Sequence, residues 1–322
     1  NNYILLRNES DEHIAKRHNL SVKQLQQAIH KMKLLLLEIR GTRVRPGLDN
    51  KVLTSWNALM LKAYVDAYTV FDEQLFLDAA VKNAEFILSN LLRNDGGLNH
   101  VFSKPSSFGE QIGLRHINGY LEDYCFTIEA LITLYEATFR QEYLLKSNEL
   151  MQYCIQHFQD EKSGMFFFTS DEDKALISRK MELSDNVIPA SNSSIAKSLF
   201  VLGHHFENTE YIVMSRKMLN NVLDEIAGYG SGYSNWAMLL LHFTQPFYEI
   251  AITGKQAEIK RKAFNSYYLP NALFAGSTEE GGLPLLKHRY NEDKTYIYVC
   301  SENTCKHPVE EVSEALQYIC LT

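Results

Sequence analysis

The chain has 322 residues, of which 45% are hydrophobic and 22% charged, and its formal net charge is -7 at pH 7. These values are typical of a compact globular protein and exclude a disordered or fibrous chain. The densest basic group is Lys260-Arg261-Lys262, and no apolar run approaches the ~20 residues that cross a bilayer, so we expect neither a nucleic-acid partner nor a membrane partner.

The first long helix is expected between Ser21 and Gly41. Ser21 and Gln24 form a capping-box pattern ahead of apolar residues at helical spacing, and Gly41 ends the run. The next segment, from Trp56 to Val70, also has helical spacing, and Asp72 is expected to cap a second helix that reaches Leu91. Together these two segments predict an αα-hairpin.

This hairpin recurs twice along the chain. Residues 121–135 lead into a helix over 141–158, and residues 195–206 lead into a helix over 211–226. The connection from Gly97 to Ser103 resembles the one from Gly164 to Ser170, at an offset of 67 residues. A repeated helix pair predicts a solenoid or a closed toroid. The long connections 94–118 and 160–190 are expected to gather at one rim of it, where loops of this length are often functional.

The pattern changes after Thr244. Strands are expected at 249–253, 271–275 and 296–300, with a helix from Gln256 to Tyr267 between the first two and a final helix that starts at Pro308. A strand, a helix and a second strand imply a small, partly parallel sheet. The predicted fold is therefore mainly α, with part of an (α/α)6-type toroid over residues 1–244 and a small α/β module over residues 245–322.

Charged and aromatic side chains gather before the second predicted helix. Arg45, Asp49, Lys51, Trp56 and Asn57 could together hold a polyhydroxylated ligand, with the indole stacking on its apolar side. An alternative fits the sequence nearly as well: Asp49 favours the helix dipole and Trp56 is ordinary core.

A polar stripe follows in the second hairpin. Tyr120, Asp123, Tyr124 and Thr127 have i, i+3, i+4, i+7 spacing, so they could face the lumen of a toroid. Asp123 is then a candidate acid or base, because a partly desolvated carboxyl group has a raised pKa. An exposed or tyrosine-bonded structural aspartate is the alternative.

Arg179, Asp185 and Asn192 surround the start of the third hairpin. The cluster Pro189 to Ser194 suits a helix cap and could present backbone amides to an anion or hydroxyl group. Asp49, Asp123 and Asp185 occupy comparable places before three successive helices. We therefore predict that these carboxylates line one rim and divide acid and base roles, as paired carboxylates do in sugar chemistry.

Five cysteines, an odd and scattered set, indicate a reducing compartment, and the cytoplasm is the expected location. The chain starts at Asn1 without a recognisable targeting signal, as if cut from a longer protein. For Cys300 and Cys305 the interpretations are, in order, packing thiols, a redox pair and a metal site. Two Cys and His307 fall short of four zinc ligands, so no metal or other cofactor is expected.

Several of these motifs in combination resemble the family of YyaL and spermatogenesis-associated protein 20. The resemblance spans almost the whole chain and rests on residues 43–57, on Tyr120 to Tyr124, on Asp185 with residues 189–193, and on residues 300–308. It implies a six-hairpin-glycosidase-like body of which this chain holds the later part, preceded by a thioredoxin-like domain that the chain lacks. It also implies a fold shared with glycosidases and sugar epimerases, although a fold does not fix a reaction.

These patterns lead to one main hypothesis and two rivals. The main hypothesis is a carbohydrate-binding or carbohydrate-processing module of unspecified reaction. Its acid or base groups are Asp49, Asp123 and Asp185, and its ligand-binding groups are Arg45, Lys51, Trp56, Asn57, Tyr120, Tyr124, Arg179 and Asn192. One rival is a noncatalytic scaffold for the thioredoxin-like domain, with Cys300 and Cys305 as a redox pair. The other is a purely structural toroid.

Overall fold

The computed structural model describes residues 6–103, 117–174, 178–302 and 304–319. By compactness the chain forms two units, residues 1–50 and residues 51–322. The first unit contains helices α1 (Asp11–Arg17) and α2 (Val22–Gly41). Ser21 and Gln24 form the predicted capping box of α2, in which the Gln24 N–H donates to the Ser21 hydroxyl at 3.2 Å and the Gln24 side chain accepts from the Ser21 N–H.

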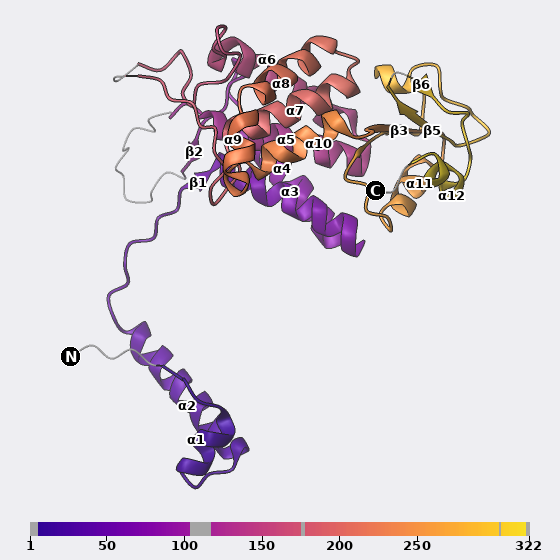
Figure 1. Ribbon diagram of the computed structural model, residues 1–322. Coiled ribbons are helices and arrows are strands. Elements are labelled where there is room, and N and C mark those ends of the chain that lie inside the picture. Colours follow the sequence, from indigo (N-terminus) through magenta and orange to yellow (C-terminus); the bar gives the residue numbers. More distant parts are fainter. Residues whose placement is uncertain (1–5, 104–116, 175–177, 303, 320–322) are drawn as a thin grey trace. The chain divides into compact units, whose positions relative to one another are not determined.

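The second unit opens with three helical hairpins, as the sequence predicts (Figure 1). Helices α3, α5 and α7 pack side by side, α10 packs on α7, and each of α4, α6 and α8 packs on the helix before it in the chain. The helical elements are α3 (Thr54–Phe71), α4 (Gln74–Asn90), α5 (Leu121–Thr138), α6 (Gln141–Phe158), α7 (Ser191–His205), α8 (Thr209–Asn220), α9 (Leu223–Gly228) and α10 (Ser234–Thr244). An inner row covered by an outer row is the arrangement of an α/α-hairpin toroid, of which this unit is a part.

The turns within the three hairpins repeat a backbone conformation that L-residues rarely adopt. Asp72, Phe139 and Glu207 have φ angles of 52°, 56° and 50°. The N–H groups of Asp72 and Phe139 each donate to the carbonyl four residues earlier in the chain, and the helix ends there. Asp72 therefore terminates α3 instead of capping α4, whose N-cap is Glu73, and the predicted Asp72 cap is wrong.

A small sheet follows the last helix of the inner row. Its strand order is β4-β3-β5-β6, with β3 (Tyr248–Thr253) parallel to β4 (Ala272–Ser277) and antiparallel to β5 (Tyr296–Ser301), which pairs with β6 (Thr304–Cys305). Helix α11 (Ala257–Phe264) makes the parallel crossover, which confirms the partly parallel sheet. A separate ribbon pairs β1 (Val52–Leu53) with β2 (Val101–Phe102).

The end of the chain differs from the sequence-based prediction. Pro308 does not start the final helix, because α12 (Val312–Ala315) begins four residues later behind the N-cap Glu311. The helices end at Thr244 and the sheet starts at Tyr248, which is where the predicted domain boundary lies. The two compact units of the chain, in contrast, meet after Asn50.

Successive side chains of β3 point alternately to the two faces of the sheet, and one face packs on the helical body. Ala251 joins the core of the helical hairpins, while Ile250 and Ile252 join a second core with Phe264 of α11. Phe139, from the turn between α5 and α6, reaches this second core. Its ring lies so close to Gly276 of β4 that a Cβ atom there would be 2.2 Å from it. Position 276 therefore requires glycine, because the hairpin turn approaches the strand too closely to leave room for a side chain.

Gly276→Ala is expected to lower the free energy of unfolding by about 1–3 kcal/mol, because the added methyl group must displace the Phe139 ring or the strand. The matched control is Gly282→Ala, at a position where the methyl group would meet open space. The control is expected to stay within about 0.5 kcal/mol of the wild type. Urea unfolding followed by circular dichroism measures both, and equal stability of the two variants would contradict this packing.

Candidate functional site

The long connections meet the inner helices at their N-terminal ends, which we call the rim. The His100 carbonyl accepts from the N–H of Thr54 at the start of α3, and the Phe168 carbonyl accepts from the N–H of Leu121 at the start of α5. The Gly232 carbonyl, just before α10, accepts from the N–H of Asp185. In the described residues, the predicted gathering of these connections at one rim is confirmed.

Asp123 is a buried carboxylate at the rim with three hydrogen-bond partners. It is 0% exposed. Its Oδ1 accepts from the N–H of Ser55 at 2.9 Å, its Oδ2 accepts from the N–H of Tyr120 at 2.8 Å, and Oδ2 lies 2.8 Å from His100 Nδ1. Ser55 belongs to the first turn of α3 and Tyr120 is the N-cap of α5. One carboxylate thus satisfies amides at the starts of two neighbouring inner helices.

The protonation states of His100 and Asp123 depend on each other. The hydrogen bond to Asp123 raises the pKa of His100, and it outweighs burial, which acts to lower that pKa. Burial raises the pKa of Asp123, against the opposing effects of His100 and the two backbone N–H groups. The ring of His100 also lies against that of Tyr120, with centroids 4.7 Å apart.

Asp185 repeats this arrangement at the next pair of inner helices. Its Oδ1 accepts from the N–H of Ala190 and from the Ser193 hydroxyl, both at 2.9 Å, and its Oδ2 accepts from the N–H of Asn235 at 2.9 Å. Ala190 is the N-cap of α7, and Asn235 lies in the first turn of α10. Glu182 also accepts from the N–H of Ser191, so amides of this cluster donate to carboxylates of the chain itself, as in a helix cap.

The polar stripe predicted on α5 does not face a lumen. Asp123, Tyr124 and Thr127 are all buried, and the Tyr124 hydroxyl accepts from the N–H of Leu98 at 2.8 Å. A different stripe on the same helix is half-buried. Between Leu121 and Tyr135 every residue is buried except Glu122, Glu129 and Thr133, and the next half-buried residue is Glu136. These four residues, at spacings of 7, 4 and 3, are here called the α5 stripe.

Glu122 is the member of the α5 stripe that lies at the rim. Its Oε1 accepts from the Ser55 hydroxyl at 3.2 Å. Burial raises the pKa of Glu122, and the neighbouring charge of Asp123 acts in the same direction, followed by that of Glu182. A half-buried carboxyl group with a raised pKa, beside a hydroxyl group, is suited to hold or transfer a proton. Glu122 is not among the site residues predicted from the sequence.

Further along the stripe, the carboxylates face cations from both neighbouring helices. Glu129 lies 3.6 Å from Lys197 Nζ of α7. Burial acts to lower the pKa of Lys62 of α3, but the charges of Glu129, Asp66 and Glu136 outweigh it and the pKa is raised. Lys197 also donates to the Asn235 side chain at 2.8 Å.

A cavity of about 130 Å³ lies beside these groups. Its lining includes Glu129, Glu136, Lys197, Ser198 and His242, together with residues of β4. The Ser198 hydroxyl and His242 Nδ1 are buried without a hydrogen-bond partner among the described residues. Both groups are therefore available to a polar ligand or to water in this cavity.

His100, Glu122 and Asp123 are also the one group among the described residues whose ligand atoms lie within 4.8 Å of one another, as a metal site requires. However, the Asp123 oxygens accept two backbone N–H groups, and Oδ2 shares a proton with His100 Nδ1. These bonds suit proton sharing better than ligation of a cation.

The remaining predicted ligand-binding residues have varied surroundings. Asn57 donates to the Leu53 carbonyl at 2.8 Å. Arg179 donates to the carbonyls of Thr169 and His157, and Asn192 bonds both the N–H and the carbonyl of Phe166. These three side chains form hydrogen bonds with the backbone of the connecting segments. Trp56 is 65% exposed, so the interpretation of Trp56 as core is wrong.

Lys51 and Tyr120 lie near the rim. The charge of Lys51 acts to lower the pKa of His100, which places Lys51 within electrostatic reach of the cluster, and the Tyr120 ring stacks on Phe168. Arg45 and Asp49 belong to the other compact unit, so their part in the site stays a prediction.

Cys300 and Cys305 are joined by a disulfide between β5 and β6. The first-ranked interpretation, two packing thiols, is therefore wrong, and the pair lies on a strand hairpin instead of before a helix. Cys125 and Cys154 are buried free thiols, whereas Cys320 lies outside the described residues.

Relatives of the chain match it over nearly its whole length. Spermatogenesis-associated protein 20 of Homo sapiens is 25% identical over 93% of the chain, and that of Rattus norvegicus is 23% identical over 97%. The uncharacterized protein B0495.5 of Caenorhabditis elegans is 27% identical over 98%. The chain covers 40%, 41% and 44% of the lengths of these relatives. The resemblance inferred from the motifs is confirmed: the chain is similar in sequence to spermatogenesis-associated protein 20 over nearly its whole length.

No family model matches the chain. Among solved structures, it is similar to a GH76 alpha-mannanase of Bacteroides thetaiotaomicron, with a TM-score of 0.47, 13% identity and coverage of 68% of this chain and 57% of the other. It is also similar to a D-mannose isomerase, with a TM-score of 0.44, 14% identity and coverage of 56% and 42%. In the part of the chain that the structure describes, no helix is both long and apolar enough to cross a membrane.

Asp123→Asn is expected to lower the free energy of unfolding by about 2–4 kcal/mol, because the amide replaces a buried charge that accepts from two helix starts. The matched control is Glu122→Gln, one residue away. It is expected to stay within about 1 kcal/mol of the wild type, since the glutamine oxygen can still accept from Ser55. Chemical unfolding at neutral pH measures both, and a stable Asp123→Asn variant would contradict the structural role of this carboxylate.

The His100–Asp123 contact should make stability depend on pH. The pKa of His100 is raised in the folded protein, so its contribution is fully present below the unfolded value of about 6.5 and is lost as pH rises through the higher folded value. The measurement is the difference in unfolding free energy between wild type and His100→Gln, from about pH 5.5 to 9. The difference should shrink as pH rises, and a difference independent of pH would rule out the charged contact.

Proposed function

We propose that the α5 stripe, together with the cavity beside it, binds and processes a carbohydrate. The main support for this proposal is the environment of Glu122. It is a half-buried carboxyl group with a raised pKa, next to a hydroxyl group and at the rim where the long loops meet. Such a group can donate a proton to a sugar oxygen or accept one from a sugar hydroxyl group.

The other groups of the stripe support a ligand that has many hydroxyl groups. Glu129 and Lys197 offer an acceptor and a donor, and Ser198 and His242 offer buried polar atoms without a partner among the described residues. Along one helix face, Glu122 and Glu129 are about 10 Å apart at ~1.5 Å per residue, a distance that a disaccharide can span. Trp56 and Tyr120 are the aromatic residues proposed to stack on the sugar ring.

In this proposal two of the three aspartates have different roles from those first predicted. Asp123 and Asp185 position the starts of the inner helices, and Glu122 takes the role of the group that exchanges the proton. Burial, followed by the negative charge of Asp123, raises the pKa of Glu122 and so favours its protonated form, whereas His100 acts to lower that pKa.

A thermal-shift screen against mono- and oligosaccharides and their phosphorylated forms tests the proposal, because a ligand that binds the native state raises its apparent stability. We expect a saturable shift with at least one sugar in the wild type. Glu122→Gln should lose most of this shift while keeping the melting temperature of the unliganded protein. Glu85→Gln, on the outer helix α4, is the matched control and should keep the shift.

Two results would contradict the proposal: a shift that survives Glu122→Gln unchanged, or no shift across the panel. The second result would favour the rival function, a noncatalytic scaffold for a thioredoxin-like domain outside this chain. The disulfide between Cys300 and Cys305 is the observation that keeps this rival in consideration.

A further inference from the structure

The disulfide lies at one edge of the sheet, where it joins β5 to the short edge strand β6. Cys300 and Cys305 are direct cross-strand partners on β5 and β6, and β6 has two residues. Their exposures differ strongly: Cys300 is 2% exposed, whereas Cys305 belongs to the exposed residues of the chain. Cys305 is therefore more accessible than Cys300 to a thiolate from outside the protein.

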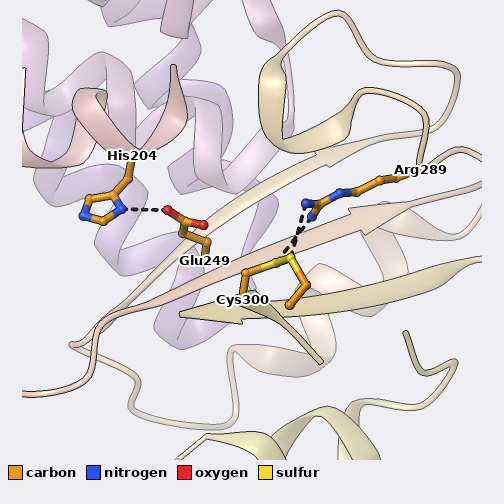
Figure 2. Close-up of a disulfide and its surroundings, with 5 residues drawn as sticks. His204, Glu249, Arg289 and Cys300 are labelled. Atoms are coloured by element: carbon orange, nitrogen blue, oxygen red, sulfur yellow. Dashed lines mark hydrogen bonds and ion pairs between the residues drawn. A yellow bond between two sulfur atoms is a disulfide. The ribbon is translucent and has the colours of Figure 1, made fainter. Parts of the chain in front are cut away.

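Arg289 holds its guanidinium group over both sulfur atoms (Figure 2). Its two terminal nitrogens lie 3.6 Å from Cys300 Sγ and 3.4 Å from Cys305 Sγ. The guanidinium carbon lies 5.0 Å from the centroid of the Tyr298 ring on β5. The Arg289 carbonyl accepts from the hydroxyl groups of Thr253 and Tyr298. The cation is thus fixed where reduction would place negative charge, and an adjacent guanidinium group stabilises a thiolate.

The pair also lies beside a contact between the sheet and the helical body. Cys300 is directly opposite Glu249 on β3, and Glu249 Oε1 lies 2.6 Å from His204 Nδ1 of α7 (Figure 2). Residues directly opposite in an antiparallel pair share a face of the sheet. The disulfide is therefore on the face of the sheet that meets α7.

We propose that Cys300 and Cys305 form a redox-active pair that exchanges with a dithiol partner, with Arg289 as its positioning residue. In the first step, a thiolate of the partner attacks Cys305 Sγ and forms a mixed disulfide, and the electron pair of the broken bond leaves on Cys300 as a thiolate beside Arg289. The second thiol of the partner then attacks the mixed disulfide and releases Cys305. The partner ends as a disulfide, and the pair gains two electrons and two protons.

The test uses the oxidised protein in a Cys320→Ser background, with dithiothreitol as the dithiol probe. After native reduction and alkylation, peptide mapping should find label first on Cys305 and more slowly on Cys300, and none on the buried Cys125 and Cys154. With oxidised glutathione, reduced Cys300→Ser should form a mixed disulfide at Cys305, and reduced Cys305→Ser should form one at Cys300 far more slowly.

Arg289→Gln should slow alkylation of the reduced pair by about three- to tenfold at neutral pH, because less of it is thiolate. Arg289→Lys should restore part of the rate. Lys306→Gln, which removes an equal charge next to Cys305 in the chain, is the matched control and should change the rate by less than about twofold. The proposal is overturned if the pair is reduced only in denaturant, if it does not reoxidise, or if Arg289→Gln and Lys306→Gln react alike.

Discussion

The rim of this protein depends on a buried negative charge that lies between the starts of two helices. Asp123 accepts from the N–H of Ser55 in α3 and from the N–H of Tyr120 at the N-cap of α5. The first amides of a helix lack partners inside that helix, and its N-terminus carries partial positive charge. A shared carboxylate satisfies both needs and fixes the spacing of the two helices. Asp185 does the same for α7 and α10.

This arrangement divides the acidic residues of the inner row into two kinds. Asp123 and Asp185 accept from backbone N–H groups at helix starts, whereas Glu122 and Glu129 of the α5 stripe contact the side chains of Ser55 and Lys197. Glu136, at the end of the stripe, lines the cavity and accepts from the N–H of Phe274. The two kinds are adjacent in sequence at residues 122 and 123. The buried charge of Asp123 is one of the reasons for the raised pKa of Glu122, so the residue that organises the rim also adjusts the residue proposed to exchange a proton.

Hydrophobic spacing predicts the three hairpins well, because each helix of the inner row buries one wide apolar face. The same method misjudges the polar residues of α5. Spacing alone cannot show that Asp123 bonds to amides of another helix, since Ser55 is 68 residues away. The recurrence of Glu122, Glu129 and Glu136 at intervals of seven in a segment that is otherwise largely apolar was a usable signal for the half-buried face. Pro308 suggested that a helix starts there, whereas its neighbour Val309 pairs with Ile297 of β5.

Amide hydrogen exchange at single-residue resolution tests the central role of Asp123 most directly, because it reports the two helix starts separately. In the wild type, the N–H groups of Ser55 and Tyr120 should both be protected. In Asp123→Asn both should lose protection together, while the N–H of Asn235, which donates to Asp185, keeps its own. If the Ser55 and Tyr120 amides stay protected in the variant, the two helices are held by other contacts and the account is wrong.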